Sequence, residues 1–318
     1  MLDPQAQSLL DLIASTGLPP VNQQTPVDAR QSYRQRRGYT QPEAPAVDCV
    51  KDHAIASGTT RITVREYRPA GSAAMTQSPA LLYLHGGGWT IGDLETHDVL
   101  CRSLCNQAQC VVLSVDYRLA PEHAFPTAYD DALAAFDWAV TEAQTLGIDA
   151  SRIAIGGDSA GGNLAAAACI GLRDKPFQPA FQLLIYPATD MRAVAPSHQR
   201  NGEGYLLTSD AIAWFTAQYL AQAADAIDWR ASPLLAASHA ELPPALVLTA
   251  GFDPLRDEGL QYADALSVAG VATQYICFER QIHGFITMGR VLGEANTAVS
   301  LCALALRSAL KGRGHPAQ

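Results

Sequence analysis

The chain has 318 residues, of which 48% are apolar and 17% are charged. Such a composition can bury a sizeable core, which excludes disorder of the whole chain and indicates one large globular unit with an accessory segment. The 22 basic and 31 acidic residues give a formal net charge of -9, which offers no overall attraction to a polyanion. We therefore predict no nucleic-acid partner.

The sequence carries no pattern typical of a membrane or secreted protein. Residues 1–11 contain neither the cationic nor the apolar part of a secretion signal, and the longest run of apolar residues and glycine, residues 164–172, is about half of what spans a bilayer. We therefore predict a cytoplasmic protein with no membrane partner. The seven cysteines follow no disulfide or zinc-binding spacing, so we expect reduced thiols and no metal ion.

Helices come first in the chain. Residues 2–38 show helical periodicity on both sides of a Pro19-Pro20 break. The second helix is rich in arginine, and we interpret this cluster as a solvated helix face rather than a phosphate site. Two strands follow, over residues 47–55 and 60–67, and their alternating pattern predicts an antiparallel hairpin at the edge of a sheet. The arginines of the cluster are Arg30, Arg34, Arg36 and Arg37.

Short apolar runs then alternate with helical stretches. The lengths and separations of these runs are typical of buried parallel strands that crossover helices connect. With the hairpin they predict an eight-stranded, mostly parallel sheet with helices on both faces. The predicted strands are residues 80–84, 110–115, 152–156, 181–186, 245–250 and 271–278. The predicted helices are residues 96–107, 126–145, 160–173, 255–269 and 291–310.

One interval is longer than an ordinary crossover. Residues 190–242 contain a predicted helix over residues 209–224, and we interpret the interval as an insertion. Together with the N-terminal helices it is expected to form a cap over the carboxyl ends of the strands, where open α/β sheets bind ligands. The predicted parts are an N-terminal helical cap segment over residues 1–45, a catalytic core over residues 46–189 and 243–318, and an insertion over residues 190–242.

The strongest chemical signal is the segment Gly157-Asp158-Ser159-Ala160-Gly161 between a predicted strand and a predicted helix. This context is that of a nucleophile elbow, in which glycines on both sides of the serine let the chain turn sharply without a Cβ clash. Ser159 is therefore the candidate nucleophile. A phosphate-binding loop is the alternative, but the Lys-Ser/Thr ending of a Walker motif and the spacing of a dinucleotide fingerprint are both missing.

A second glycine-rich motif, His85-Gly86-Gly87-Gly88-Trp89, leaves the end of the strand at residues 80–84. Consecutive glycines let backbone amides approach a substrate oxygen without obstruction by side chains. We predict that the amides of Gly87, Gly88 and Ala160 form an oxyanion hole and that His85 and Gly86 support the loop. A flexible turn is the alternative interpretation.

A serine nucleophile needs a general base. Among the eight histidines, His283 is the one that lies just beyond a late strand, in a loop that can reach the carboxyl edge of the sheet. Apart from His85 in the glycine-rich motif, a solvated or structural role is the expectation for the other six.

The base in turn needs an orienting acid, which should follow the strand at residues 245–250. Asp253 has this position, whereas Asp257 lies a turn further on and is expected to pair with Arg256 or another basic group. A helix N-cap is the alternative role for Asp253, because Pro254 follows it. The chain order Ser159, Asp253, His283 is the order of triads built on this elbow.

Together these motifs resemble the hormone-sensitive-lipase-like carboxylesterases, whose bacterial members carry a Gly-Asp-Ser-Ala-Gly elbow. The resemblance covers nearly the whole chain. It implies an α/β-hydrolase fold with a helical cap, hydrolysis of short- to medium-chain acyl esters, and a structural role for residues 116–122. The segments that carry it are residues 85–89, 116–122 with 125–126, 157–161, 253–257 and 283–285.

The predicted reaction is acyl transfer through an acyl-enzyme, with a small-molecule ester as substrate and no cofactor. Trp89, Trp214 and Phe215 are candidates for an acyl pocket, with packing inside the cap as the alternative. An amidase, lactonase or peptidase stays open, because a triad does not define the leaving group. A ligand-binding receptor of the same fold is disfavoured, because such receptors lack the catalytic histidine and this chain has His283. The sequence does not give the oligomeric state, for which we consider a homodimer.

Overall fold

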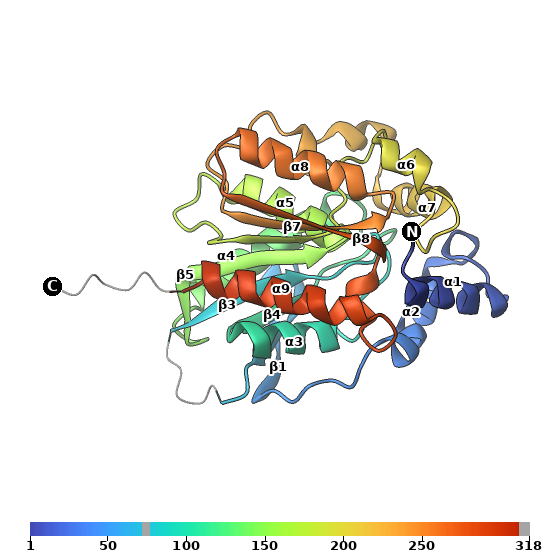
Figure 1. Ribbon diagram of the computed structural model, residues 1–318. Helices are drawn as coiled ribbons and strands as arrows, with labels where there is room; N and C mark the ends of the chain where they lie inside the picture. The colour runs from blue at the N-terminus through green and yellow to red at the C-terminus, as the bar shows by residue number, and fades with distance from the viewer. Residues whose placement is uncertain (72–76, 312–318) are drawn as a thin grey trace.

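A computed structural model describes residues 1–71 and 77–311. The centre of the protein is one eight-stranded sheet (Figure 1). Its strand order is β1-β2-β4-β3-β5-β6-β7-β8. β2 runs antiparallel to β1 and to β4, and the other neighbours are parallel, which confirms the predicted sheet and its edge hairpin. The strands are β1 Cys49–Ser57, β2 Thr60–Arg68, β3 Ser78–Leu84, β4 Val111–Asp116, β5 Ile148–Asp158, β6 Gln182–Ile185, β7 Ala245–Phe252 and β8 Thr273–Ile282.

Helices cover both faces of the sheet. α4, α5 and α8 share a buried cluster with one face, and α3 and α9 share a second cluster with the other. The α-helices are α1 Pro4–Ser15, α2 Pro26–Thr40, α3 Asp98–Ala108, α4 Thr127–Thr141, α5 Ala160–Leu172, α6 Pro196–Arg200, α7 Ser209–Tyr219, α8 Arg256–Val268 and α9 Gly293–Ala309. The 3-10 turns are η1 Val21–Gln23, η3 Ala223–Ile227, η4 Pro233–Leu235 and η5 Phe285–Thr287.

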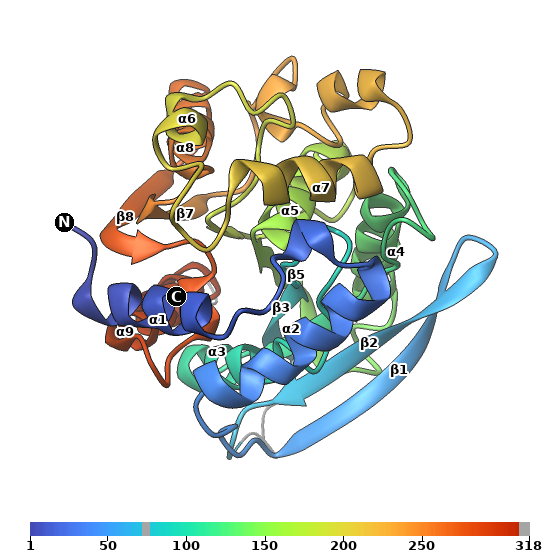
Figure 2. The same cartoon turned by 90° about the vertical axis from the view of Figure 1, so that its right-hand side faces the viewer.

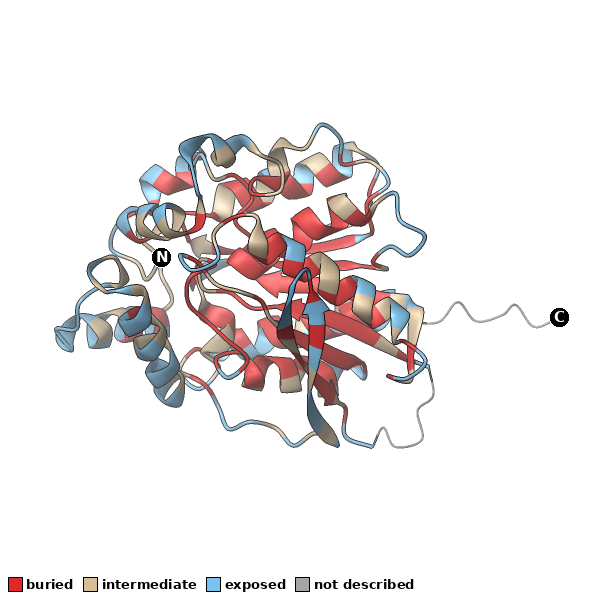
Figure 3. Cartoon of the chain, turned by 180° about the vertical axis from the view of Figure 1, so that it is seen from behind, coloured by how far each residue is buried: buried red, intermediate tan, exposed pale blue. Residues whose placement is uncertain are grey.

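The central strands are continuous apolar runs because both of their faces are covered. In β3, Leu82 and Leu84 belong to the cluster under α4, α5 and α8, whereas Leu81 and Tyr83 belong to the cluster under α3 and α9. Figure 3 shows the consequence, since the strands are mostly buried and the N-terminal helices are mostly exposed. The sheet therefore gives the site a rigid support, because its side chains interdigitate on both faces.

Several element boundaries differ from those predicted. β8 continues to Ile282 because it stays paired with β7 as far as Phe252, so the strand delivers His283 directly. α7 ends at Tyr219, since Leu220 has an extended backbone with ψ 128°. The five-residue helix α6 was not predicted, because it is too short to show a periodic pattern.

Four helices lie beyond the carboxyl ends of the strands, where Figure 2 shows α1, α2, α6 and α7 facing the viewer. The interpretation of the α2 arginines as a solvated face is wrong for Arg30, which donates hydrogen bonds of 2.8 Å to the carbonyl oxygens of Thr90 and Ala120 and pairs with Glu122. These partners are distant in sequence, so helical periodicity could not reveal them. Within residues 1–71 and 77–311, no helix has the length and apolar character needed to cross a membrane.

Candidate active site

Ser159 forms the sharp connection between β5 and α5. Its backbone has φ 55° and ψ -117°, a strained conformation for a residue with a side chain. The amide of Ser159 donates to the carbonyl oxygen of Ile185, 2.9 Å away, which holds the turn against β6. A Cβ at Gly157 or Gly161 would collide with the carbonyl oxygen of Leu84. The two glycines are thus required for the elbow to approach the end of β3.

The structure brings Ser159, Asp253 and His283 together from three separate loops. His283 Nε2 lies 2.9 Å from Ser159 Oγ, and His283 Nδ1 lies 2.7 Å from Asp253 Oδ2. The ring of Tyr186 packs against the His283 ring, with centroids 4.6 Å apart. This is the geometry in which a histidine can accept the serine proton while a carboxylate fixes its tautomer.

Asp253 is fully buried and uses both carboxylate oxygens. Oδ2 faces His283, while Oδ1 accepts a 2.8 Å hydrogen bond from the amide of Leu255 at the entrance to α8. The N-cap of α8 is Leu255, so Asp253 is not the helix cap, and its bond to Leu255 closes a turn just ahead of the helix. Asp257 points elsewhere and forms ion pairs with Arg256 at 3.1 Å and Arg200 at 3.2 Å.

The oxyanion loop, residues 85–89, lies beside the elbow. Gly87 and Gly88 have φ 127° and 55°, which glycine adopts readily. Within the described residues, no protein acceptor takes the amides of Gly87, Gly88 or Ala160, so the three donors are available to a ligand. His85 is fully buried, and burial followed by the nearby His97 ring lowers its pKa to about 4, so it stays neutral.

Asp158 fixes the oxyanion loop to the elbow, a role that the sequence did not reveal. Its Oδ1 accepts hydrogen bonds from the amide of Gly86 at 2.9 Å and from the hydroxyl of Tyr83 at 2.7 Å, and it lies 3.2 Å from His97 Nε2. Burial acts to raise the pKa of this carboxyl, but the His97 ring and the hydrogen bonds from His97 and Tyr83 together hold it below its ordinary value. Asp158 thus remains ionised and acts as an acceptor at the base of the loop.

The aromatic candidates for the acyl pocket occupy different environments. Trp89 is 4% exposed and stacks on Tyr219 of α7, with ring centroids 4.4 Å apart. The ring of Phe215 lies so close to Gly88 that a Cβ at position 88 would come within 2.8 Å of its Cε1 atom. Trp214 makes an edge contact with Phe215 at 5.1 Å. Phe215 is therefore the aromatic residue placed directly over the oxyanion loop.

Other histidines of the described residues have structural partners. His97 contacts Asp158, His53 lies 2.7 Å from Glu66, and His239 lies 2.9 Å from the carbonyl oxygen of Pro233. No group of three or more His, Cys, Asp or Glu side chains in this part of the chain is arranged to hold a metal ion. His315 lies outside the described residues.

Comparison with known proteins identifies the family. Residues 81–287 match the family described as alpha/beta hydrolase fold. The chain belongs to this family. It is 47% identical to the carboxylic ester hydrolase LipN of Mycobacterium tuberculosis, over 82% of this chain and 70% of that protein. It is 42% identical to an ethyl acetate hydrolase of Pseudomonas putida, over 89% of this chain and 90% of that protein.

Solved structures extend the likeness to the whole fold. An ester hydrolase from the metagenome of Lake Arreo, solved in complex with a bipyridine phosphonate derivative, is 43% identical and superposes with a TM-score of 0.94. The match covers 97% of this chain and 99% of that one. These findings confirm the resemblance to the hormone-sensitive-lipase-like branch of the α/β-hydrolase superfamily.

Proposed function

We propose that the protein is a serine carboxylesterase that hydrolyses short- to medium-chain acyl esters through an acyl-enzyme. The observation that carries the proposal is the hydrogen-bonded chain from Ser159 through His283 to Asp253, beside three amides that lack a protein acceptor. The relatives named carboxylic ester hydrolase and ethyl acetate hydrolase support the same chemistry.

In the first step Ser159 Oγ attacks the ester carbonyl while His283 Nε2 takes the hydroxyl proton. Asp253 stabilises the imidazolium that forms, because its carboxylate faces Nδ1. The negative charge on the carbonyl oxygen is stabilised by the amides of Gly87, Gly88 and Ala160. His283 then protonates the alcohol as it leaves.

In the second step water replaces the alcohol. His283 removes a proton from the water, which attacks the acyl-enzyme at the same oxyanion hole. The bond between the acyl carbon and Ser159 Oγ then breaks, His283 returns the proton to Oγ, and the acid is released. Because every proton passes through His283, the reaction requires this ring in its neutral form at the start of each step. No step in this scheme calls for a cofactor.

We further propose that residues 1–45 and 190–242 act together as a cap on the core, and that Phe215 limits the acyl chain. The position of Phe215 over Gly88 supports this role, whereas the stacking of Trp89 on Tyr219 indicates that Trp89 joins the oxyanion loop to α7. A substrate chain that extends past Gly88 would meet the Phe215 ring first.

A panel of 4-nitrophenyl esters from acetyl to dodecanoyl, with matched amides and lactones, tests the proposed activity. We expect turnover of the short and medium esters, slower turnover of the amides, and none with Ser159→Ala. An amide rate above the ester rate would favour the amidase alternative, and binding of esters without turnover would favour a receptor.

The assembly and location are separate proposals. β8 is an edge strand whose outer side pairs with no strand among the described residues, which supports a homodimer through this edge. Sedimentation velocity on the purified chain tests this, with a monomer at micromolar concentration as the contrary result. Cell fractionation tests the proposed cytoplasmic location.

A further inference from the structure

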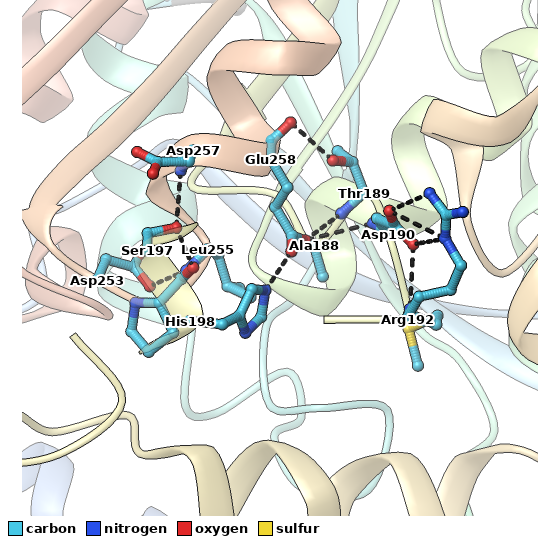
Figure 4. A network of polar contacts seen from close by, with 12 residues as sticks. Ala188, Thr189, Asp190, Arg192, Ser197, His198, Asp253, Leu255, Asp257 and Glu258 are labelled. Carbon is cyan, nitrogen blue, oxygen red and sulfur yellow. Dashed lines mark hydrogen bonds and ion pairs between the residues drawn. The ribbon is translucent and has the colours of Figure 1, made fainter. Parts of the chain in front are cut away.

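Helix α6 of the insertion lies against the loop that carries Asp253. This acid loop, residues 251–255, runs from the end of β7 into α8, and α6 packs on the start of α8 (Figure 4). Two polar residues of this segment are almost completely buried, Ser197 with no exposed surface and Asn201 with 4%. Burial of such side chains is unfavourable unless their hydrogen bonds are made, so their partners indicate what they do.

Asn201 holds the backbone on both sides of the turn into the acid loop. Its Nδ2 donates to the carbonyl oxygen of Asp253 at 3.0 Å and to that of Gly251 at 3.2 Å. The pairing of β7 with β8 shifts register between Ala250 and Phe252, where Gly251 alone faces the three β8 residues 279–281. Such an irregularity interrupts the ladder and redirects the strand. Asn201 therefore binds the backbone at the point where the regular pairing of β7 with β8 is interrupted.

Ser197 holds the next part of the loop. Its Oγ donates to the carbonyl oxygen of Pro254 at 2.5 Å and accepts from the amide of Asp257 at 3.0 Å. The amide of Asp257 belongs to the first turn of α8, where helix donors have no partner inside the helix. Ser197 thus joins the end of the acid loop to the helix that follows.

α6 itself is fixed to α8 by a buried pair. His198 Nε2 lies 2.5 Å from Glu258 Oε2, and the other oxygen of Glu258 accepts from the amides of Thr189 at 2.7 Å and Asp190 at 3.3 Å. Glu258 has no exposed surface, and Figure 4 shows it between His198 and the strand-end segment at Thr189 and Asp190. The segment that contacts the acid loop is consequently anchored to the core through Glu258.

We propose that Asn201 and Ser197 are positioning residues for the esterase reaction, which act by fixing the backbone of Asp253 so that its carboxylate meets His283. This inference rests on the proposed function. Neither side chain contacts Ser159, His283 or the oxyanion loop, so their effect must pass through Asp253. The 2.7 Å contact between Asp253 and His283 leaves little tolerance, and a displacement of about 1 Å near a reacting group can cost about 100-fold in rate.

A double-mutant cycle tests the proposal. Asn201→Ala is made in the wild-type chain and in Asp253→Ala, and kcat and KM are measured with a fluorogenic acetate ester. We expect kcat to fall about 10- to 100-fold in the wild-type background with little change in KM. In Asp253→Ala the same substitution should change kcat by less than about twofold, since the residue through which it acts is absent.

Three further variants separate positioning from folding. Asn201→Asp replaces the donor by a carboxylate oxygen that faces two carbonyl oxygens, so it should lower kcat at least as much as Asn201→Ala. Ser197→Ala should show the same dependence on Asp253. Arg200→Ala is the matched control, because it removes only a surface ion pair with Asp257 from the same helix and should leave kcat unchanged. Thermal unfolding of each variant reports any loss of fold.

A second measurement does not depend on turnover. The Nδ1 proton of His283, bonded to Asp253, should give a downfield proton resonance in the wild-type chain that shifts or disappears in Asn201→Ala. An unchanged resonance and unchanged kcat would overturn the proposal, as would equal losses of kcat in both backgrounds. A resonance that changes in a chain without esterase turnover would support the positioning role and contradict the proposed function instead.

Discussion

Asp253 has two contacts that require its charge and its exact placement in the loop. One oxygen accepts from the amide of Leu255, and the other faces Nδ1 of His283 at 2.7 Å. In Asp253→Asn the side-chain NH2 group would face either the amide of Leu255 or Nδ1 of His283, although both positions call for an acceptor. The substitution would therefore favour the wrong tautomer of the imidazole. The carboxylate of Asp257, four residues further on, forms its ion pairs with Arg200 and Arg256 instead.

We therefore expect Asp253→Asn to lower kcat by about 10⁴, while Asp257→Asn lowers it by less than about tenfold. Steady-state kinetics with a short 4-nitrophenyl ester, on variants whose circular dichroism matches the wild-type, provides the measurement. The opposite ranking of the two variants would show that the wrong carboxylate has been assigned to the triad.

The contacts of Ser159, Asp253 and His283 with one another could be predicted because each residue lies in a loop after a predicted strand, in an order that the elbow defines. The contacts of Asp158 and His97 could not. Asp158 was visible only as part of the elbow motif, and its contact with Gly86 joins positions far apart in the chain. A carboxylate that joins two loops can be recognised only once the packing of the loops is known, and a local sequence pattern carries no information on that packing.

At the scale of elements, helix α7 packs over the oxyanion loop. Tyr219 is buried against Trp89, while Phe215, one turn earlier on the same helix, covers Gly88. The helix is thus fixed at one residue and presents the other to the site. In the proposed pocket, each acyl methylene with an apolar contact would contribute about 0.8 kcal/mol until the chain reaches the Phe215 ring.

For Phe215→Ala we expect the preferred acyl chain to lengthen beyond the butanoyl to hexanoyl optimum expected for the wild-type, because removal of the ring opens space beyond Gly88. The kcat/KM profile from acetyl to dodecanoyl esters measures this, with Gln218→Ala on the same helix as the control. An optimum that does not move, or a wild-type profile still rising at dodecanoyl, would remove Phe215 from the pocket.

The second element with a testable role is the segment over residues 116–122, which begins at the last residue of β4. Its first residue, Asp116, has a pKa raised to about 6, by burial first and then by Asp93, against the opposing charges of Arg34 and Arg65. A carboxyl with a raised folded-state pKa favours the native state in its protonated form. Its contribution to stability is complete below the unfolded value of about 3.9 and is lost as the pH rises through about 6.

Asp116→Asn should therefore raise the free energy of unfolding at pH 8 by up to about 3 kcal/mol, and by less at pH 5. Denaturant unfolding at the two pH values checks this, and kcat should stay unchanged if the segment is structural. A gain that is absent at pH 8, or that is equal at both values, contradicts the assigned environment of this carboxyl.

At the scale of the whole molecule, the strands of the core could be predicted from the sequence more fully than the helices over the strand ends. β3, β4 and β6 are buried on both faces, so composition alone identifies them, and each lies where it was predicted to within about three residues. The composition of residues 190–242 is not constrained in this way by burial on both faces. α6 is short, and its position depends on Glu258 and the acid loop, which are distant in sequence.

The proposed mechanism requires one nucleophile, Ser159, at the carboxyl edge of the sheet, with the base, the acid and the oxyanion loop supplied by separate loops. Labelling by a fluorophosphonate, followed by peptide mass spectrometry, tests this most directly. The account predicts a single adduct on Ser159, no adduct in Ser159→Ala, and a loss of about 10⁶ in kcat for that variant. Full labelling of Ser159→Ala, or turnover that survives the substitution, would contradict it.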